Sequence, residues 1–389
     1  FWLWIVRKIL PRQMRKDYGI TEVECVGAEK LRASIDAGHG IVIAGNHCRP
    51  CDPMVLDSLA AEVRRPFHII ASWHVFMTSA VQRFLLPRLG GFSVYREGID
   101  RESLKCAVNI VAEGKHPLVI FPEGIITRCN DRLVNFMEGP AFIARAAAKQ
   151  RKQGKVVIHP VFIRYFFEGD LRKTVIPVVE EIERRLSWQP QTQLPLRERI
   201  GKVGDALLSL KEMEYFQAKQ AGTFHERLQR MLDHLLVPLE NQWTAGRHDG
   251  DVMARVKRLR SAILPDMVAG DLTDDERSAR WRHLADVYLV QQLHCYPGDY
   301  FENLTPERIL ETVERYEEDL TDLARPHYPI RAIITVGDAI EVSATRERSQ
   351  DSDPVTTEVR RQLEAMLEST KSQRRSHPTG TEDLSLTEN

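Results

Sequence analysis

A histidine and an aspartate lie five residues apart in the segment from Asn46 to Asp52. The apolar run over residues 41–45 precedes them and predicts a strand. His47 is then expected in a turn at the carboxyl end of that strand, where open α/β sheets hold their ligands. We expect Asp52 to cap the helix that Pro53 opens, and its carboxylate to reach back to the imidazole. Such a contact fixes the tautomer and leaves the other ring nitrogen free as a base.

Two further segments carry polar side chains after predicted strands. Phe121-Pro122-Glu123-Gly124 follows an apolar run, and Pro122 ends the strand because proline cannot donate to the ladder. Glu123 would share a sheet edge with His47 if the two strands are parallel neighbours. Arg96 follows a glycine turn and a short predicted strand, and its guanidinium suits a phosphate or a carboxylate. Each residue alone also has a structural explanation, namely a salt bridge, a helix cap or a core histidine, but three converging loops favour a site.

These segments resemble the motifs of the glycerolipid acyltransferase superfamily, whose founding members acylate lysophosphatidate. The N-H-x4-D block is matched by Asn46, His47 and Asp52, the G-x4-R block by Gly91 and Arg96, and the F-P-E-G block by Phe121, Pro122, Glu123 and Gly124. A fourth block, an apolar strand that ends in a proline, is matched around residues 156–161. The resemblance covers roughly residues 25 to 168 and agrees in order and spacing.

The resemblance implies transfer of a fatty acyl group from acyl-CoA or acyl carrier protein to a hydroxyl of a glycerolipid such as 1-acylglycerol-3-phosphate. His47 would be the general base and Asp52 would orient it. The implied substrate-binding residues are Asn46, Gly91, Arg96, Phe121, Pro122, Glu123, Gly124 and Arg128. Arg96 would hold the acceptor phosphate, with Arg128 in reserve, because Ile125 and Ile126 displace the threonine and arginine that usually follow this loop. The sequence does not identify the oxyanion donor, for which backbone N–H groups after the His47 turn are the candidates.

Other functions stay open at this point. A thioesterase would use the same base with water as the acceptor, and the acceptor of a transferase need not be a phosphatidate precursor. A catalytically silent lipid-binding scaffold is the alternative from another class, although a binding module has no need of an oriented base. Cys48 and Cys51 form a C-x2-C pair of the kind found in redox motifs or zinc sites. They occupy variable positions of the histidine motif, so we expect no metal and no cofactor beyond the acyl-thioester co-substrate.

Composition narrows the partners and the location. The 389 residues are 43% hydrophobic with a formal net charge of −1, so attraction to nucleic acid is not expected. Six scattered cysteines indicate a reducing compartment. We expect the partners to be an acyl-thioester donor, possibly carried by an acyl carrier protein, a lipid acceptor and a membrane surface. These partners suggest a role in phospholipid biosynthesis.

The first sixteen residues mix aromatic side chains with cations, which is typical of a segment in a membrane interface. The alternative is a helix packed on the protein's own core. The apolar stretch over residues 73–89 predicts a core helix or a lining for the acyl chain. Because the sequence begins at Phe1 rather than methionine, a preceding anchor stays open. We expect the cytoplasmic face of a membrane, with peripheral binding or an anchor that precedes Phe1.

Strand and helix patterns alternate through residue 165, which indicates an α/β fold: a largely parallel mixed sheet flanked by helices, with an all-helical insertion. The expected parts are an N-terminal interfacial segment over 1–24, an acyltransferase core over 25–179, the helical insertion over 180–328, a returning core strand and closing helix over 329–371, and a disordered tail over 372–389. Strands are predicted at 41–45, 68–72, 92–96, 118–121, 156–165 and 331–343. Helices are predicted at 28–37, 53–64, 74–87, 100–113, 140–152, 180–186, 196–219, 224–243, 251–263, 274–293, 306–323 and 351–371.

Overall fold

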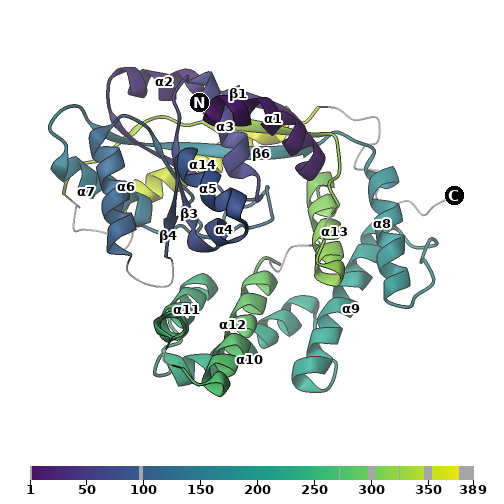
Figure 1. Cartoon of the computed structure of the whole chain (residues 1–389). Helices are drawn as coiled ribbons and strands as arrows, with labels where there is room; N and C mark the ends of the chain where they lie inside the picture. Colours follow the sequence, from purple (N-terminus) through teal and green to yellow (C-terminus); the bar gives the residue numbers. More distant parts are fainter. Residues whose placement is uncertain are drawn as a thin grey trace.

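The computed structural model describes residues 2–95, 100–270, 272–296, 301, 304–323, 325–345 and 353–375. A mixed sheet of eight strands lies at its centre (Figure 1). The strands are β1 Ile20–Val26, β2 Gly40–Gly45, β3 His68–Ser72, β4 Gly91–Val94, β5 Leu118–Ile120, β6 Val156–Phe167, β7 Ile330–Val336 and β8 Ile340–Glu341. Their order is β1-β7-β6-β2-β5-β3-β4, with β8 beside β6. Strands β6, β2, β5, β3 and β4 are mutually parallel, whereas β7 runs antiparallel to β6, so the expected α/β class is confirmed.

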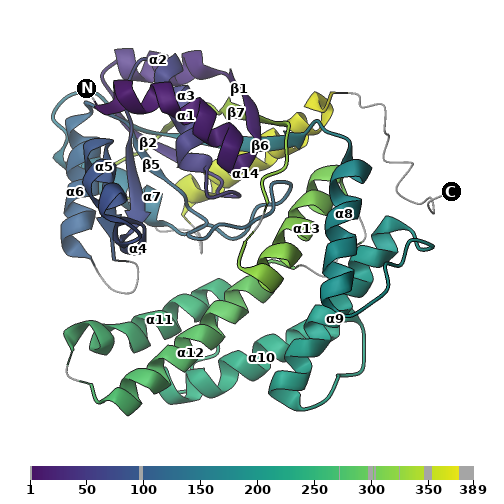
Figure 2. The same ribbon diagram turned by 45° about the vertical axis from the view of Figure 1, so that its right-hand side comes forward.

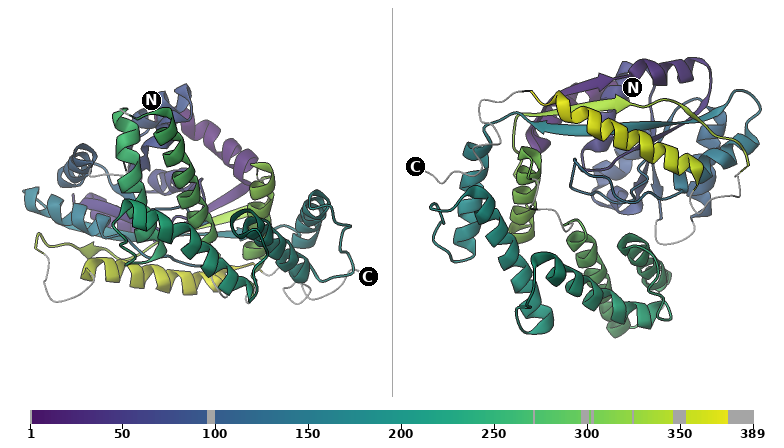
Figure 3. Two further views of the ribbon diagram at one scale, coloured as in Figure 1. Left: turned by 90° about the horizontal axis from the view of Figure 1, so that it is seen from below. Right: turned by 180° about the vertical axis from the view of Figure 1, so that it is seen from behind.

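Helices cover both faces of this sheet. The helices of the sheet region are α1 Trp2–Tyr18, α2 Ala28–Asp36, α3 Asp52–Glu62, α4 Trp73–Met77, α5 Ala80–Arg88, α6 Arg101–Glu113, α7 Gly139–Gln150 and α14 Pro354–Thr370. Figure 3 shows α14 along one face, with α1 to α3 on the other. Two apolar clusters fill these layers: Leu31, Val55 and Ile163 belong to the first, and Ala144 and Leu363 to the second. Alternate side chains of β6 enter opposite clusters, as the pleat requires.

Between β6 and β7, helices are the only regular elements that the described residues form. They are α8 Leu171–Arg185, α9 Leu196–Phe216, α10 Phe224–Trp243, α11 Val252–Ala269, α12 Asp274–Leu293 and α13 Pro306–Thr321. Figure 2 shows α9 to α12 as an arm beside the sheet, and α13 as the helix that returns to it. A third apolar cluster, with Leu235, Leu259 and Val290 at its centre, joins α10, α11 and α12. None of the helices described is long and apolar enough to cross a membrane.

Several element boundaries differ from the prediction. Strand β1 was not predicted, and the expected boundary at residue 24 falls inside it. The helix expected at 74–87 is divided, because Ser79 accepts a hydrogen bond from the Gln82 N–H and starts a new helix there. Helix α8 begins at Leu171, where Asp170 caps it, so the expected boundary at 179 lies within α8.

The start of the expected disordered tail is also different. A short 3₁₀ helix occupies Lys371–Gln373, Arg374 pairs with Glu307, and Arg375 pairs with Glu22. The remaining residues of that tail, 376–389, lie outside the described part of the chain. Ion pairs to residues far away in the sequence hold Arg374 and Arg375, and no local pattern signals such contacts.

Candidate active site

Strand β2 brings the first two motifs together at one sheet edge. It lies between β5 and β6 and is parallel to both, with Ala44 level with Ile120. The parallel neighbours expected for the His47 and Glu123 strands are therefore confirmed. The loops that follow β2 and β5 leave the sheet side by side, and the His47 ring stacks on Phe121 at 4.1 Å between centroids and 17° between planes. We call residues 46–52 the His–Asp turn, and residues 121–124 the Phe-Pro-Glu-Gly loop.

The His–Asp turn holds the imidazole in one orientation. His47 Nδ1 lies 2.8 Å from Asp52 Oδ2, and the Asp52 side chain is fully buried. The His47 side chain keeps 12% of its surface exposed. Because an ionised carboxylate accepts hydrogen bonds only, Nδ1 carries the hydrogen in this contact and Nε2 is the basic nitrogen. The arrangement can take a proton from a hydroxyl or from water.

Asp52 is held by more than the histidine. Its Oδ2 also accepts the backbone N–H groups of Cys48 at 2.8 Å and Arg49 at 3.0 Å. The helix N-cap is Cys51, without a side-chain cap, so the expectation that Asp52 caps α3 is wrong. The carboxylate turns back into its own loop instead. The backbone N–H groups of Cys48 and Arg49, inside the turn, therefore donate to Asp52.

Glu123 joins the two loops. Its Oε2 accepts the His47 N–H at 2.6 Å, and its Oε1 accepts the Val134 N–H at 3.2 Å. The residue is only 3% exposed, and burial raises the pKa of Glu123 to about 8, although both N–H groups favour the charged form. The carboxylate thus braces the backbone of His47 and a later part of the loop.

The other residues of the Phe-Pro-Glu-Gly loop shape its backbone. The Pro122 carbonyl accepts the Met137 N–H at 2.8 Å. Gly124 has φ +71°, and a Cβ there would lie 2.0 Å from Met137 Cε, so both the conformation and the space favour glycine. Gly91 begins β4, where a Cβ would lie 3.0 Å from the Leu86 carbonyl oxygen. These positions belong to the architecture of the loops.

Asn46 lies beneath the turn and is 2% exposed. Its Nδ2 donates to the Ile163 carbonyl at 2.9 Å, and its Oδ1 accepts the Ile163 N–H at 2.7 Å. The amide therefore fastens the end of β2 to β6 at a point where the strand ladder has already ended. These contacts orient the His–Asp turn from below, whereas the sequence motif implied contact with substrate.

Only one of the two predicted phosphate ligands, Arg128, is among the described residues. Arg96 lies outside them, and the described strand β4 ends at Val94, two strands from β5. Arg128 adopts φ 52° and donates to Glu318 Oε1 of α13 at 2.7 Å. Burial and the neighbouring Arg315 lower the pKa of Arg128. An anion at Arg128 would compete with Glu318.

The cysteine pair is buried beside Asp52. Cys51 Sγ lies 3.7 Å from the Tyr165 hydroxyl, and Cys48 Sγ lies 4.0 Å from Asp52 Oδ1. Burial raises the pKa of Cys51 to about 12, with Asp52 adding to the effect, and raises that of Cys48 as well. Among the described residues no three histidine, cysteine or carboxylate side chains cluster as a metal site would require.

Sequence reasoning missed three contributors to this site. Tyr165 on β6 donates its hydroxyl to Asp52 Oδ1, and the Thr127 N–H donates to the His47 carbonyl at 2.8 Å. The third is Glu311 of α13, whose Oε1 accepts Asn130 Nδ2 at 2.7 Å. A tyrosine hydroxyl within a largely apolar strand was the one available signal, because a buried hydroxyl needs a partner. Nothing local distinguishes Thr127 or Glu311.

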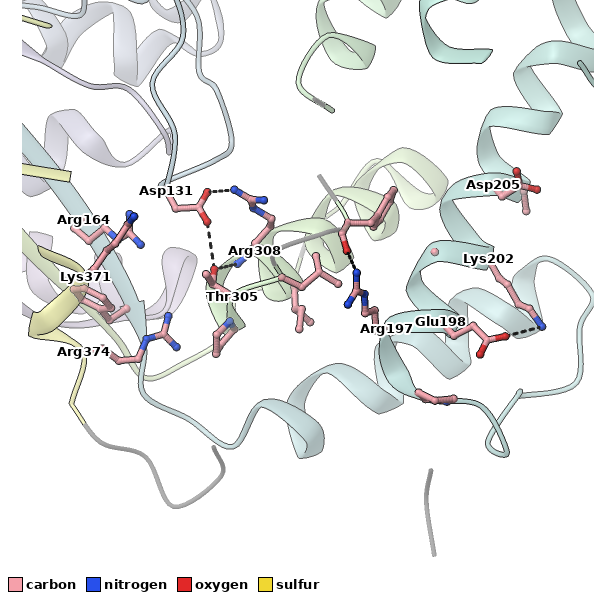
Figure 4. A pocket seen from close by; sticks show the side chains of 18 of the residues that line it. Asp131, Arg164, Arg197, Glu198, Lys202, Asp205, Thr305, Arg308, Lys371 and Arg374 are labelled. Carbon is pink, nitrogen blue, oxygen red and sulfur yellow. Dashed lines mark hydrogen bonds and ion pairs between the residues drawn. The ribbon is translucent and has the colours of Figure 1, made fainter. Parts of the chain in front are cut away.

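A large cleft lies elsewhere in the described structure (Figure 4). It has a volume of about 1610 Å³ and lies between the end of β6, helix α9 and the start of α13. Its cations have partners in the protein: Arg308 pairs with Asp131, Lys202 with Glu198, Arg374 with Glu307, Lys371 with Glu368, and Arg164 donates to the Asn130 carbonyl. None of the described motif residues lines it.

The comparison with protein families agrees with the sheet edge. Residues 22–164 match the family described as Acyltransferase. No curated protein matches the chain. The matched region begins in β1 and ends in β6, and it contains the His–Asp turn, β4 and the Phe-Pro-Glu-Gly loop. This match identifies residues 22–164 as an acyltransferase domain of the glycerolipid acyltransferase type.

Proposed function

We propose that this protein is an O-acyltransferase that moves a fatty acyl group from acyl-CoA or acyl carrier protein to a glycerolipid hydroxyl. The 2.8 Å contact between His47 Nδ1 and Asp52 Oδ2 carries the proposal. The contact orients a base whose second nitrogen is free for a substrate. Since the described residues near that ring include no serine or cysteine bonded to it, the attacking group is assigned to the acceptor. The first acceptor to test is 1-acylglycerol-3-phosphate.

In the proposed reaction, His47 Nε2 accepts the proton of the acceptor hydroxyl while the hydroxyl oxygen attacks the thioester carbonyl carbon. The tetrahedral intermediate then collapses, the carbon–sulfur bond breaks, and the imidazolium returns its proton to the leaving thiolate. Asp52 stabilises the imidazolium between these steps. Positioned acid–base catalysis of this kind contributes about 10² to 10⁴ in rate.

Arg96 remains the proposed ligand of an acceptor phosphate, on the strength of the G-x4-R motif. Arg128 is the weaker candidate, because a phosphate there has to displace Glu318. The acyl chain supplies the donor affinity, at about 0.8 kcal/mol per buried CH₂ group. Recognition of the acceptor therefore depends on one cation, Arg96. The affinity for the donor depends on burial of its acyl chain against apolar surface.

The membrane surface is the proposed location of the reaction. The two apolar segments noted in the sequence lie together, since the Trp2 and Phe84 rings make an edge contact with centroids 5.5 Å apart. Several other apolar side chains of α1, α4 and α5 are exposed, and together we call Trp2, Trp4, Ile9, Val75, Met77, Val81 and Phe84 the apolar patch. Lys8 and Arg88 lie over Trp4 and Phe84 and supply positive charge at its border. Aromatic, aliphatic and basic side chains in this arrangement suit an anionic bilayer.

Only part of α1 is available for that role. Arg7 is held in a bidentate pair with Asp57 of α3, with both distances 2.8 Å, and Met14 is buried in the core. The second half of α1 therefore packs on the domain, as the alternative reading of the sequence expected. Residues 2–9 carry the exposed tryptophans.

The test is a transfer assay with purified protein, isotopically labelled acyl-CoA or acyl carrier protein, and a panel of lysophospholipid and glycerol phosphate acceptors, read by mass spectrometry. We expect an acylated acceptor from the wild type, and at least a tenfold to hundredfold lower rate from His47→Ala. His225→Ala, which changes an exposed histidine of α10, is the control and should keep full activity.

Each outcome separates the candidate functions. Free fatty acid in place of an acylated acceptor would identify a thioesterase. Lipid binding without turnover of any thioester would identify a silent scaffold. With an active wild type, an Arg96→Ala variant should raise the acceptor KM far more than the donor KM, and Arg128→Ala should do so less.

A further inference from the structure

Helix α13 buries more charged side chains than any other described helix between β6 and β7. Its charged residues with less than a tenth of their surface exposed are Glu307, Arg308, Glu311, Arg315 and Glu317. Burying a charge is costly unless it is paired and hydrogen-bonded. The partners of these side chains therefore indicate what the helix is positioned to do.

One of them reaches the His–Asp turn directly. The Arg49 guanidinium lies 3.6 Å from Glu311 Oε1 and 3.4 Å from Glu314 Oε2. The same residue donates its backbone N–H to Asp52 Oδ2. Arg49 is thus held by α13 through its side chain and by Asp52 through its backbone.

A second route runs through the core. Glu311 Oε1 accepts Asn130 Nδ2 at 2.7 Å, and Asn130 Oδ1 accepts the Tyr165 N–H at 3.1 Å. The Tyr165 hydroxyl donates to Asp52 Oδ1. Glu311 is therefore joined to the two oxygens of Asp52 by two separate chains of contacts. Buried networks of this kind are rigid only when every member is satisfied.

A third route reaches the histidine. Arg315, one turn after Glu311, donates Nη2 to the Arg128 carbonyl at 3.1 Å. The preceding residue, Thr127, donates its N–H to the His47 carbonyl. Helix α13 therefore contacts the segments that hold His47 and Asp52, which we call the dyad. About 260 residues of sequence separate Glu311 from these two residues.

We propose that Glu311 is a positioning residue for the proposed transfer reaction, through which helix α13 holds Asp52 and hence the His47 ring in the productive orientation. The inference rests on the proposed function and gives α13 a role within it. Burial raises the pKa of Glu311 to about 7, while the charge of Arg49 opposes this shift and favours the carboxylate form. The acyltransferase domain then requires α13 for efficient turnover.

The test compares three variants of the full chain. Glu311→Gln removes the charge but not the shape, and Glu311→Asp restores the charge on a shorter side chain. Glu317→Gln is the matched control, because Glu317 is buried on the same helix and pairs with Arg325 of the following segment. We expect Glu311→Gln to lower kcat by about tenfold to a hundredfold, in line with small misplacements of a catalytic group, with both KM values within about twofold. Glu311→Asp should recover part of the loss, and Glu317→Gln should retain the wild-type kcat.

A spectroscopic readout tests the positioning independently of turnover. Nitrogen-15 NMR of histidine-labelled protein reports which ring nitrogen carries the hydrogen, and the His47 signals are assigned by their loss in His47→Gln. We expect one tautomer in the wild type and in Glu317→Gln, and a mixture in Glu311→Gln. If the wild type transfers no acyl group, the proposed function fails, while the tautomer comparison still tests the link between α13 and the dyad.

Arg49→Met provides a second line of evidence if Glu311→Gln is too unstable to purify. In a double-mutant cycle, residues that act through one contact lose less together than the sum of their separate effects. Non-additive losses in kcat are therefore expected. Additive losses, an unchanged His47 tautomer, or a Glu311→Gln variant with raised KM and normal kcat would each overturn the proposal.

Discussion

Tyr165 donates its phenolic hydroxyl to Asp52 Oδ1 at 2.5 Å, on the oxygen that His47 does not contact. Tyr165 is 1% exposed, and burial together with the Asp52 charge raises its pKa far above the ordinary value, so the group stays a hydrogen-bond donor. The carboxylate thus has a donor at each oxygen and little freedom to rotate. The order of the dyad depends on a strand that lies more than 100 residues further along the chain.

The first prediction follows from this contact. Tyr165→Phe keeps the ring but removes the hydroxyl, which leaves Asp52 Oδ1 without its strongest donor. We expect a loss of about 1.5–3 kcal/mol in the free energy of unfolding, the usual contribution of a hydrogen bond to a charged group. We also expect kcat to fall by about tenfold, equivalent to about 1.4 kcal/mol in the barrier. Urea unfolding and steady-state kinetics measure the two effects.

Tyr215→Phe is the matched control, because Tyr215 donates to Asp286 Oδ1 at 2.7 Å within the helical arm. That variant should lose stability and keep its kcat. Equal kcat values for the wild type and Tyr165→Phe would show that the tyrosine does not orient Asp52.

The second prediction concerns the cysteines. Burial keeps Cys48 and Cys51 as neutral thiols at neutral pH, whereas Cys106 is exposed on α6. Because the thiolate is the reactive form, a thiol reagent added to the native protein should modify Cys106 quickly and the buried pair only after unfolding. Peptide mass spectrometry of timed samples measures this order. Rapid native labelling of Cys51 would point back to redox chemistry at the turn.

The third prediction concerns pH. The pKa of Glu123 is raised in the folded state from 4.5 to about 8, so folding favours the protonated form. The stability contributed by that form is complete at low pH and is lost as pH rises through about 8. The free energy of unfolding of the wild type should therefore fall, relative to that of Glu123→Gln, between about pH 5 and pH 9.

Glu358→Gln serves as the control for this titration. Arg361 lowers the pKa of Glu358 to about 2, so its charge is constant over the same range. The difference between the wild type and that variant should not change from pH 5 to pH 9. A wild type that gains stability relative to Glu123→Gln with rising pH would show that the two N–H donors outweigh burial.

The fourth prediction concerns the apolar patch. Replacement of Trp4, Met77 and Val81 by serine removes three of its four most exposed side chains and leaves the Arg7–Asp57 pair intact. We expect sedimentation with vesicles that contain anionic lipid to fall sharply, and the binding of the wild type to weaken with added salt. Trp281→Ser is the control, since Trp281 is similarly exposed but lies on α12. Loss of binding in that control alone would place the docking surface on the arm.

The residue pattern by itself predicted the alternation of strands and helices and the contact between His47 and Asp52. It placed Phe121–Gly124 at the same edge on the condition that β2 and β5 are parallel neighbours, which the structure supplied. These features depend on local signals: an apolar run, a proline that ends a strand, and the rule that parallel strands end at the same edge. The division between α4 and α5 and the missed strand β1 show the limit of such signals. Strand β1 has polar residues at alternate positions and is completed only by its pairing with β7.

Only the tertiary structure decided how the dyad is held. The Asp52 carboxylate turns from the helix start to its own loop because two backbone N–H groups and Tyr165 meet it there. Glu123 accepts the His47 N–H, and Arg128 donates to Glu318. Both contacts join residues at least 76 positions apart in the sequence. Hydrogen bonds and ion pairs depend on distance in space, and no periodicity along the chain encodes which distant group will lie within 3 Å. For the same reason, the sequence did not predict the contacts that link α13 to the His–Asp turn.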